Sequence, residues 1–396
     1  MSEHSAALPY GRHTIDDADV AEVVRVLRSD WLTTGPDVEA FEKALAQYVG
    51  AKHAIAVNSA TSALHLAMRV AGIGPGDRVL TSANTFLASA NCAAYVGATP
   101  DFADIDPRTY NLSPVSLQQA WREDVRAVVA VDFAGQPCEL PAIGELAHNR
   151  GAVVIDDASH ALGASFEHEG NRHRIGNNPW ADMTVFSFHP VKTLTTGEGG
   201  ALVTNNDDYA KHARRLRSHG MVRDSDQFLG LEAGPDEFGP WYYEMQDLGY
   251  NYRITDFQCA LGRSQLARLD RFVERRAEIV GRYNEAFAHL RGTVIPFAIP
   301  AARPSWHLYV LQIDFEKLGQ SRTEVMQQLR ARGIGTQVHY IPVHLQPYYR
   351  RNYGYGPGKC PVAESYYTRC LSLPLFPGLN DGDVERVVKS VLAVLA

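Results

Sequence analysis

Cysteine is scarce in this sequence, and its spacing excludes two classes of small protein. Five cysteines are scattered through 396 residues, and no two of them form a CxxC pair. The odd number and wide spacing argue against a zinc ribbon and against a disulfide framework, so no metal site is expected. A reducing compartment fits this pattern, and we expect a cytoplasmic protein.

Long apolar runs and dense positive charge are also missing. No stretch of about 18 consecutive apolar residues occurs, so no membrane span is expected. The N-terminal residues are polar and acidic, whereas a signal peptide begins with a basic and then an apolar run. The net charge is −7 and no lysine- or arginine-rich run occurs, so no nucleic-acid partner is expected.

Short apolar runs alternate with helical patterns from about residue 54 to residue 217. Strands that are apolar along their whole length, alternating with helices, predict a mainly parallel α/β sheet covered by helices on both faces. Seven strands are predicted, at residues 54–57, 77–82, 98–105, 125–133, 152–159, 183–189 and 200–205. Helices are predicted at residues 61–72, 86–97 and 140–151.

The rest of the chain predicts a second, smaller unit. Residues 219–250 are rich in Gly, Asp, Pro and aromatics and are predicted to form a long loop. A helical pattern from Thr255 to about Leu290 predicts a long helix joining two domains. A strand at 307–314 and helices at 322–333 and 383–396 follow. We therefore expect a large domain over residues 1–250 and a smaller α+β domain over residues 251–396.

One lysine, Lys192, lies between a predicted strand and a glycine-rich stretch in FSFHPVKTLTTGEGG (residues 186–200). Ligands of parallel sheets gather at the carboxyl ends of the strands. A lysine there can form an imine with an aldehyde cofactor once its surroundings lower its pKa. Taken alone, the pattern fits a surface lysine beside a turn better.

Two acids, Asp156 and Asp157, end the buried strand in VVIDDASHALGA (residues 153–164). A buried carboxylate is costly unless it meets a cation or a donor. Pyridoxal phosphate (PLP) needs such a carboxylate, because its protonated ring is the electron sink of the reaction. A helix N-cap is the alternative for this pair, and only one of the two acids need be functional.

Small hydroxyl residues lead directly into a helix in NSATSALHLAM (residues 58–68). A helix N-terminus favours an anion such as a phosphate. Ordinary capping by Ser59 or Thr61 is the alternative. An anion cradle, an acid at a strand end and a lysine on a glycine-rich loop, in this order within one α/β unit, are hard to obtain by chance.

The sequence resembles the DegT/DnrJ/EryC/StrS family of sugar aminotransferases almost end to end, from LPYGRHTI (8–15) and DWLTTGP (30–36) to LSLPLFPGL (371–379). The resemblance implies the PLP-dependent transferase fold of type I, PLP as the cofactor, and amino transfer from glutamate to a nucleotide-linked keto sugar. It implies that Lys192 binds the cofactor aldehyde and that Asp157 pairs with the pyridine nitrogen. Asp156 falls where relatives often have Glu.

The resemblance also assigns further cofactor contacts. His160 matches a residue that contacts the ring hydroxyl. Phe86 sits where relatives stack an aromatic ring on the cofactor, although a core aromatic on a helix is an equal interpretation. Asn251, in LGYNYRITDFQ (248–258), matches an asparagine that reaches the phosphate from the neighbouring subunit, which implies a homodimer with shared active sites. The matching phosphate ligands within the subunit are Thr61, Ser62 and Ser187.

A finer resemblance concerns the substrate. Residues 241–262 and 336–350 look like the branch of the family that acts in pseudaminic acid biosynthesis. That branch aminates carbon 4 of UDP-2-acetamido-2,6-dideoxy-β-L-arabino-hex-4-ulose with glutamate as donor. Perosamine- and bacillosamine-type aminotransferases share most of these motifs and are the alternatives.

Both substrates are anionic while the chain is net negative, so local cations and donors must bind them. A structural ion pair is the alternative for the arginine among the candidates, and hydrogen-bonded loop positions are the alternatives for the histidines. The candidate substrate residues are Thr33, Thr34, Gly35, Arg253, His339 and His344.

Three rival functions fit the residues less well. A PLP-dependent sugar dehydratase of the same family carries histidine in place of Lys192. A non-catalytic regulatory protein has no need of intact Lys192, Asp157 and Asn251. A nicotinamide dehydrogenase needs a G-x-G-x-x-G motif after the first strand, and the sequence has none there.

Overall fold

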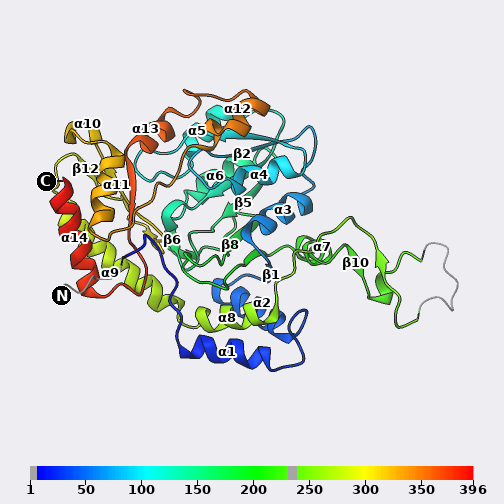
Figure 1. Cartoon of the computed structure of the whole chain (residues 1–396). Helices are drawn as coiled ribbons and strands as arrows, with labels where there is room; N and C mark the ends of the chain where they lie inside the picture. Colours follow the sequence, from blue (N-terminus) through cyan, green and yellow to red (C-terminus); the bar gives the residue numbers. More distant parts are fainter. Residues whose placement is uncertain (1–6, 231–238, 396) are drawn as a thin grey trace.

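The computed structural model describes residues 7–230 and 239–395. A seven-stranded sheet lies at the centre of the larger part of the molecule (Figure 1), in the order β1-β9-β8-β5-β4-β2-β3. In this sheet β9 runs antiparallel to β1 and β8, and every other pair is parallel. The predicted fold class is therefore confirmed. The strands are β1 (His53–Val57), β2 (Arg78–Ser82), β3 (Thr99–Ala103), β4 (Val125–Val131), β5 (Val153–Asp157), β8 (Met183–Ser187) and β9 (Gly200–Thr204).

Helices cover both faces of this sheet, because its strands send apolar side chains to each side. One face packs through Ile55, Val129 and Leu202, and the other through Ala56 and Val154. The helices on the first face are α3 (Ala60–Val70), α4 (Ala88–Tyr95) and α7 (Asp207–Arg217). Those on the second face are α2 (Pro36–Val49), α5 (Pro114–Ala120), α6 (Leu140–His148) and α8 (Asp256–Leu266).

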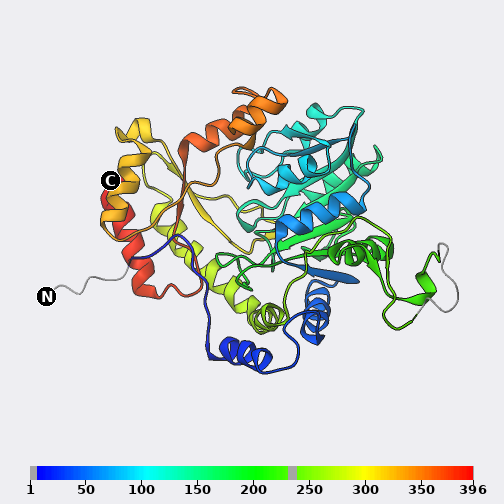
Figure 2. The same cartoon turned by 45° about the vertical axis from the view of Figure 1, so that its right-hand side comes forward.

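A separate apolar core forms the C-terminal part of the molecule (Figure 2). Leu8 packs in this core and pairs with Ile334, so the N-terminal segment crosses to it. The division of the chain at residue 250 stays a prediction. The sheet strands here are β12 (Thr293–Val294), β14 (Tyr309–Ile313) and β15 (Cys370–Leu373). The helices that pack in this core are α9 (Leu269–Phe287), α10 (Phe315–Leu318), α11 (Arg322–Ala331) and α14 (Asp381–Leu395). Helices α12 (Pro347–Tyr353) and α13 (Pro361–Arg369) pack instead against the larger part, in a cluster with Phe102 and Phe133.

The predicted continuous helix from Thr255 to Leu290 is wrong, because the chain breaks it into α8 and α9. Arg268, between the two, leaves helical geometry with φ −114°. Its guanidinium pairs with Asp16 and Asp19 at the start of α1 (Asp17–Leu27). Apolar periodicity does not reveal such a break, since it continues across the turn.

Two short hairpins were not predicted. β6 (Ser165–His168) pairs with β7 (Asn171–Arg174) through a turn in which Glu169 and Gly170 both have positive φ, as tight hairpins require. β13 (Ala302–Arg303) extends this pair. Within the segment predicted as a loop, β10 (Met221–Val222) pairs with β11 (Glu244–Met245), and this arm projects from the body in Figure 1. Residues 231–238 of that prediction lie outside the described residues.

The structure also bears on the cysteines and on membrane-spanning helices. All five cysteines are buried and free of disulfides. Within residues 7–230 and 239–395, no helix has the length and apolarity needed to cross a bilayer.

Candidate active site

A cavity of about 540 Å³ opens at the carboxyl ends of the parallel strands. Val131, Asp157 and Ser187 line it, and they end β4, β5 and β8. Open α/β sheets bind their ligands at this edge, and the volume is typical of small-molecule sites. Six of the predicted cofactor residues line this cavity: Thr61, Phe86, Asp157, His160, Ser187 and Lys192.

Lys192 lies in the loop after β8 with its side chain on the cavity wall. Its Nζ makes no hydrogen bond or ion pair with any residue that the structure describes. Burial lowers the pKa of this amine to about 8, and the carboxylate of Asp157 acts in the opposite direction. A lysine with a lowered pKa is partly neutral near pH 7 and can attack an aldehyde. The interpretation as a surface lysine beside a turn does not fit this position.

Asp157 is buried, and both oxygens of its carboxylate accept hydrogen bonds. The Ser89 hydroxyl donates to Oδ2 at 2.6 Å. The Ser159 hydroxyl and backbone N–H donate to Oδ1 at 2.6 and 3.2 Å. Sequence reasoning missed both serines. The position of Ser159 beside the acid was an available signal, whereas Ser89 comes from α4 and is distant in the chain.

Asp156 does not line the cavity, because successive residues of a strand point to opposite faces. Its carboxyl is fully buried, and neither oxygen has a hydrogen-bond partner among the described residues. Burial raises the pKa of Asp156 well above its usual range, and the nearby charges of Asp132 and Asp157 act in the same direction. Burial also raises the pKa of Asp132 to about 7. Of the two adjacent acids, only Asp157 is placed to meet a ligand.

The start of α3 forms an anion cradle in which Ser59 is the helix cap. Its Oγ accepts the N–H of Ser62 at 3.1 Å. The N–H groups of Ala60 and Thr61 have no partner among the described residues, and both residues line the cavity. Ser62 does not line the cavity, and its hydroxyl donates to Asn58 Oδ1 at 2.6 Å. The predicted contact of the Ser62 hydroxyl with phosphate is therefore not available in this arrangement.

Phe86 lines the cavity and is 58% exposed, so it is not a core aromatic. It precedes α4 rather than lying inside a helix, and its ring centroid lies 6.4 Å from that of Tyr340. The side chain is thus positioned to cover a flat ligand. Its stacking on the cofactor stays a prediction.

Three buried imidazoles surround Lys192: His160, His307 and His339. Burial, together with the positive charge of Lys192, lowers the pKa of His160 and of His307 well below the usual range and that of His339 to about 3. The three rings are therefore neutral. His339 lines the cavity as predicted, but it offers a hydrogen bond rather than a charge to an anionic substrate.

The tautomer of His160 follows from its backbone partner. Ala134 donates its N–H to Nδ1 at 3.2 Å, so the proton of the neutral ring is on Nε2. Nε2 lies 3.3 Å from the Tyr340 hydroxyl and donates to it. Tyr340 was part of a quoted motif but was not assigned a role. Other lining residues that sequence reasoning missed are Tyr10, His189, Glu198, His307 and Gln337.

His344 lies away from the cavity, and its proposed role in substrate binding is corrected. Its side chain is fully buried, and Nε2 bonds to Glu364 Oε1 at 2.8 Å. The ring centroid lies 6.0 Å from that of Phe102. The residue therefore joins α13 to the larger part of the molecule. This is the structural role given above as the alternative to substrate binding.

Five other predicted contacts do not line this subunit's cavity: Thr33, Thr34, Gly35, Asn251 and Arg253. Asn251 is exposed. The two tyrosines beside it, Tyr250 and Tyr252, stack with centroids 4.8 Å apart. Their hydroxyls bond to Arg69 and His65 of α3 at 2.7 and 2.9 Å. This anchoring leaves the Asn251 side chain at the surface, as a contact to a second subunit requires.

Comparisons with known proteins agree with this geometry. The model of the DegT/DnrJ/EryC1/StrS aminotransferase family matches residues 13–392. Spore coat polysaccharide biosynthesis protein SpsC of Bacillus subtilis is 45% identical and covers 97% of this chain and 96% of its own. Helicobacter pylori PseC, an aminotransferase involved in the biosynthesis of pseudoaminic acid, is 30% identical with a TM-score of 0.88, covering 98% of this chain and 99% of that one. Spr1654 of Streptococcus pneumoniae, assigned as a sugar aminotransferase and solved in its PLP form, is 30% identical with a TM-score of 0.87, covering 98% of both chains.

The chain belongs to the DegT/DnrJ/EryC1/StrS aminotransferase family and is a PLP-dependent sugar aminotransferase. The residues of the cavity fit this cofactor. Lys192 supplies an amine that has no partner among the described residues, Asp157 supplies a fixed carboxylate, and the start of α3 supplies two N–H donors that are likewise unpaired within that part of the chain. These groups match the aldehyde, the ring nitrogen and the phosphate of PLP in chemistry.

Proposed function

We propose that this enzyme transfers the amino group of glutamate to carbon 4 of a nucleotide-linked 4-keto-6-deoxy sugar. The proposed acceptor is UDP-2-acetamido-2,6-dideoxy-β-L-arabino-hex-4-ulose, and the proposed assembly is a cytoplasmic homodimer with shared active sites. The observation that carries the amino transfer is that Lys192 and Asp157 line one cavity together with the α3 cradle. The sugar is supported by the resemblance of residues 241–262 and 336–350 and by the likeness to PseC.

When bound, PLP supplies an electron sink that stabilises negative charge at the substrate carbon. Lys192 would hold its aldehyde and, once released as a free amine, carry a proton to and from the substrate carbon on Nζ. Its lowered pKa of about 8 suits this role, because both protonation states are accessible near neutral pH. Asp157, oriented by Ser89 and Ser159, would keep the proton on the ring nitrogen. The N–H groups of Ala60 and Thr61 would bind the phosphate.

The neutral imidazoles complete this environment. Because His160, His307 and His339 carry no charge, they do not repel a proton on Lys192. They also cannot neutralise the diphosphate of the sugar nucleotide. A cation for that purpose must come from elsewhere, and Arg253 is the candidate.

A second candidate is another nucleotide-sugar 4-aminotransferase, of the perosamine or bacillosamine type. The observation that favours a sugar other than the proposed one is that the identity to SpsC, named for spore coat polysaccharide biosynthesis, is 45%, whereas the identity to PseC is 30%. Both candidates use the same cofactor residues, so they differ only in the sugar and nucleotide.

The test is an assay of purified enzyme with glutamate and a panel of UDP-, GDP- and dTDP-linked 4-keto sugars. Formation of 2-oxoglutarate and the mass of the aminated sugar are measured. We expect kcat/KM for the proposed UDP sugar to exceed the others by about 100-fold, which corresponds to about 2.7 kcal/mol. A preference for a GDP- or dTDP-linked sugar, or for another UDP-linked 4-keto sugar, would favour the second candidate, and no transfer to any sugar would contradict both. Lys192→Ala serves as the inactive control.

A further inference from the structure

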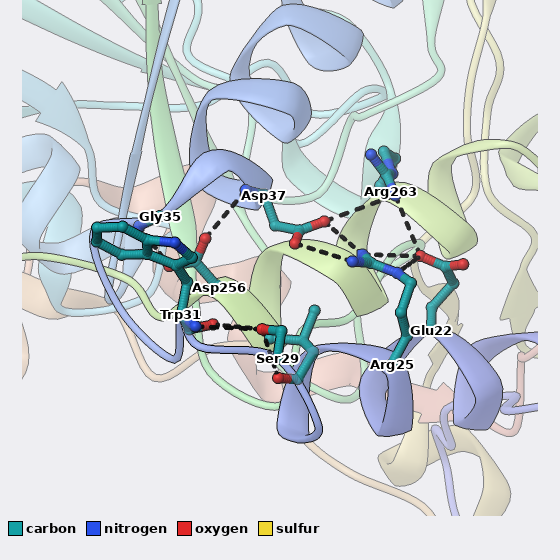
Figure 3. A network of polar contacts seen from close by, with 9 residues as sticks. Glu22, Arg25, Ser29, Trp31, Gly35, Asp37, Asp256 and Arg263 are labelled. Atoms are coloured by element: carbon teal, nitrogen blue, oxygen red, sulfur yellow. Dashed lines mark hydrogen bonds and ion pairs between the residues drawn. The ribbon is translucent and has the colours of Figure 1, made fainter.

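Helix α2 begins without a cap of its own, because its N-cap residue is Gly35. The cap comes from Asp256, which is 221 positions further along the chain. Its Oδ2 accepts the N–H of Gly35 at 2.8 Å, and its Oδ1 accepts the N–H of Asp37 at 3.0 Å (Figure 3). One carboxylate thus satisfies two free donors of the helix and interacts favourably with its dipole.

The segments around Gly35 and Asp256 also contact each other through their backbones. Its own N–H donates to Leu32 O at 3.0 Å, and Thr33 pairs with Thr255 as an antiparallel bridge. A Cβ on Gly35 would lie 2.6 Å from Trp31 Cβ and 2.7 Å from Asp256 Oδ1, so no side chain fits there. We call residues 31–35 and 253–256 the Asp256 joint, since they are held as one piece.

Ion pairs support the joint from outside. Asp37, in the first turn of α2, pairs with Arg25 and Arg263, and Glu22 pairs with the same two arginines (Figure 3). These residues come from α1, α2 and α8. The start of α2 is therefore fixed against two neighbouring helices as well as by Asp256.

The joint carries four of the residues predicted to bind substrate. The bridge between Thr33 and Thr255 is two residues from both Gly35 and Arg253, so it holds the turn beside that arginine. The hydroxyl residues Thr33 and Thr34 are exposed, and Thr34 has a left-handed φ of 54°. The Arg253 guanidinium has no hydrogen bond or ion pair within residues 7–230 and 239–395. The backbone thus presents an arginine that has no partner among the described residues, together with two exposed hydroxyls, of which that of Thr34 donates to the Thr33 backbone O at 2.7 Å.

We propose that Asp256 is a positioning residue that presents the Thr33–Thr34 turn and Arg253 together to the sugar nucleotide in the partner subunit's active site. The inference rests on the proposed function. Arg253 follows Asn251 by two residues, a reach of about 7 Å. If Asn251 meets the partner's cofactor phosphate, the joint lies beside the same site. An arginine and two hydroxyls suit a diphosphate, which arginine binds through paired hydrogen bonds.

The first test compares kinetic constants of three variants. Asp256→Asn leaves one acceptor oxygen for two N–H donors, and Gly35→Ala strains the joint from the other side. Both should raise KM for the UDP keto sugar about tenfold while leaving cofactor content and the half-reaction with glutamate unchanged. The matched control is Asp314→Asn, which alters the cap of α10 in the smaller core and should leave KM unchanged. If Asp256→Asn and Gly35→Ala leave KM unchanged, the inference is wrong.

The second test decides which active site the joint serves. Heterodimers of Lys192→Ala and Asp256→Asn subunits are purified through two different tags. If the joint acts across the interface, the site with an intact Lys192 receives an intact joint, and KM returns to the wild-type value. A KM that stays raised would show that the joint serves its own subunit, which overturns the proposal.

A third pair of variants separates this inference from the proposed function. Thr34→Ala and Arg253→Ala should each raise KM for the sugar nucleotide. If both raise KM and Asp256→Asn does not, the turn binds substrate without the proposed positioning role. If Lys192→Ala homodimers remain active, the proposed active site itself is wrong, whatever the joint does.

Discussion

The cavity wall and the Asp256 joint differ in whether their polar side chains have hydrogen-bond partners. On the cavity wall, Asp157 is held by Ser89 and Ser159 from the same subunit, and the neutral rings of His160 and His339 are hydrogen-bonded. In the joint, the backbone is fixed just as firmly, yet Arg253 has no partner among the described residues. The groups that orient Asp157 thus come from one chain, while the predicted recognition groups Thr33, Thr34 and Arg253 lie outside this subunit's cavity. This difference predicts that variants of the cavity abolish chemistry, whereas variants of the outward-facing groups weaken binding.

The largest expected effect tests the cavity side. Asp157→Asn should lower kcat by at least about 10²–10³-fold, the usual cost of removing one fixed electrostatic group from an active site. An amide cannot hold a proton on the ring nitrogen. Asp156→Asn is the matched control, because this neighbouring acid does not line the cavity. Steady-state rates of both variants are compared with those of the wild type, and a reversed ranking would show that the wrong aspartate has been named.

An intermediate effect, on cofactor binding, is expected for Asn251, which lies outside this subunit's cavity. Asn251→Ala should weaken PLP retention by about 10- to 100-fold, because a hydrogen bond to a charged acceptor contributes about 1.5–3 kcal/mol. Equilibrium dialysis of the cofactor gives the dissociation constant. Asn149→Ala, another exposed asparagine, should change nothing. Equal PLP dissociation constants for the Asn251 and Asn149 variants would show that Asn251 does not bind the cofactor. The proposed difference between the two regions would then lose its support.

The smallest expected effect on catalysis belongs to Asp132, a buried acid that does not line the cavity, and its substitution should change stability instead. Burial raises the pKa of Asp132 from 3.8 to about 7, so between these values the folded state holds a proton that the unfolded state has lost. The free energy of unfolding should therefore fall as pH rises through this window, by about 1.4 kcal/mol per pH unit for one proton. Asp132→Asn should remove this contribution.

The measurement is urea unfolding of the wild type and Asp132→Asn from pH 4 to 7. The buried histidines contribute the opposite slope, because their lowered pKa values favour the unfolded state as pH falls. Because the charge of Asp132 also raises the pKa of Asp156, the difference between the two proteins reports both carboxyls together. Asp208→Asn, at an exposed position, is the control. Parallel curves for Asp132→Asn and the wild type would contradict the prediction.

The sheet was predictable because its strands are continuous apolar runs. Runs such as VRAVVAV (125–131) leave little choice of conformation once helices alternate with them. The break at Arg268 was not predictable, since it depends on an ion pair with Asp16 and Asp19 from the other end of the chain. Two early helices, α1 and α2, were not assigned, although Asp16 and the Gly35–Pro36 pair are ordinary start signals.

The same distinction holds for the site. Lys192, Asp157 and the start of α3 were found because they lie in the loop after a strand, at a strand end and at a helix start, where ligands gather. Ser89 and His307 were missed, because they approach the cavity from elements distant in the chain. His344 was misplaced because a histidine in a polar, aromatic loop gives no sign in sequence that it is buried against Glu364.

The hydrogen bonds of the Asp256 joint have a consequence for how substrate range can change. They use the backbone of Leu32, Gly35 and Asp37 and involve no side chain of positions 33 and 34, where the Thr34 hydroxyl bonds to the Thr33 backbone O. A library that randomises positions 33, 34 and 253 while keeping Gly35 and Asp256 would alter the chemistry of the surface without altering its scaffold. Selection on new sugars would then yield folded enzymes at a high rate, and diversification at positions 35 and 256 would mostly yield inactive ones.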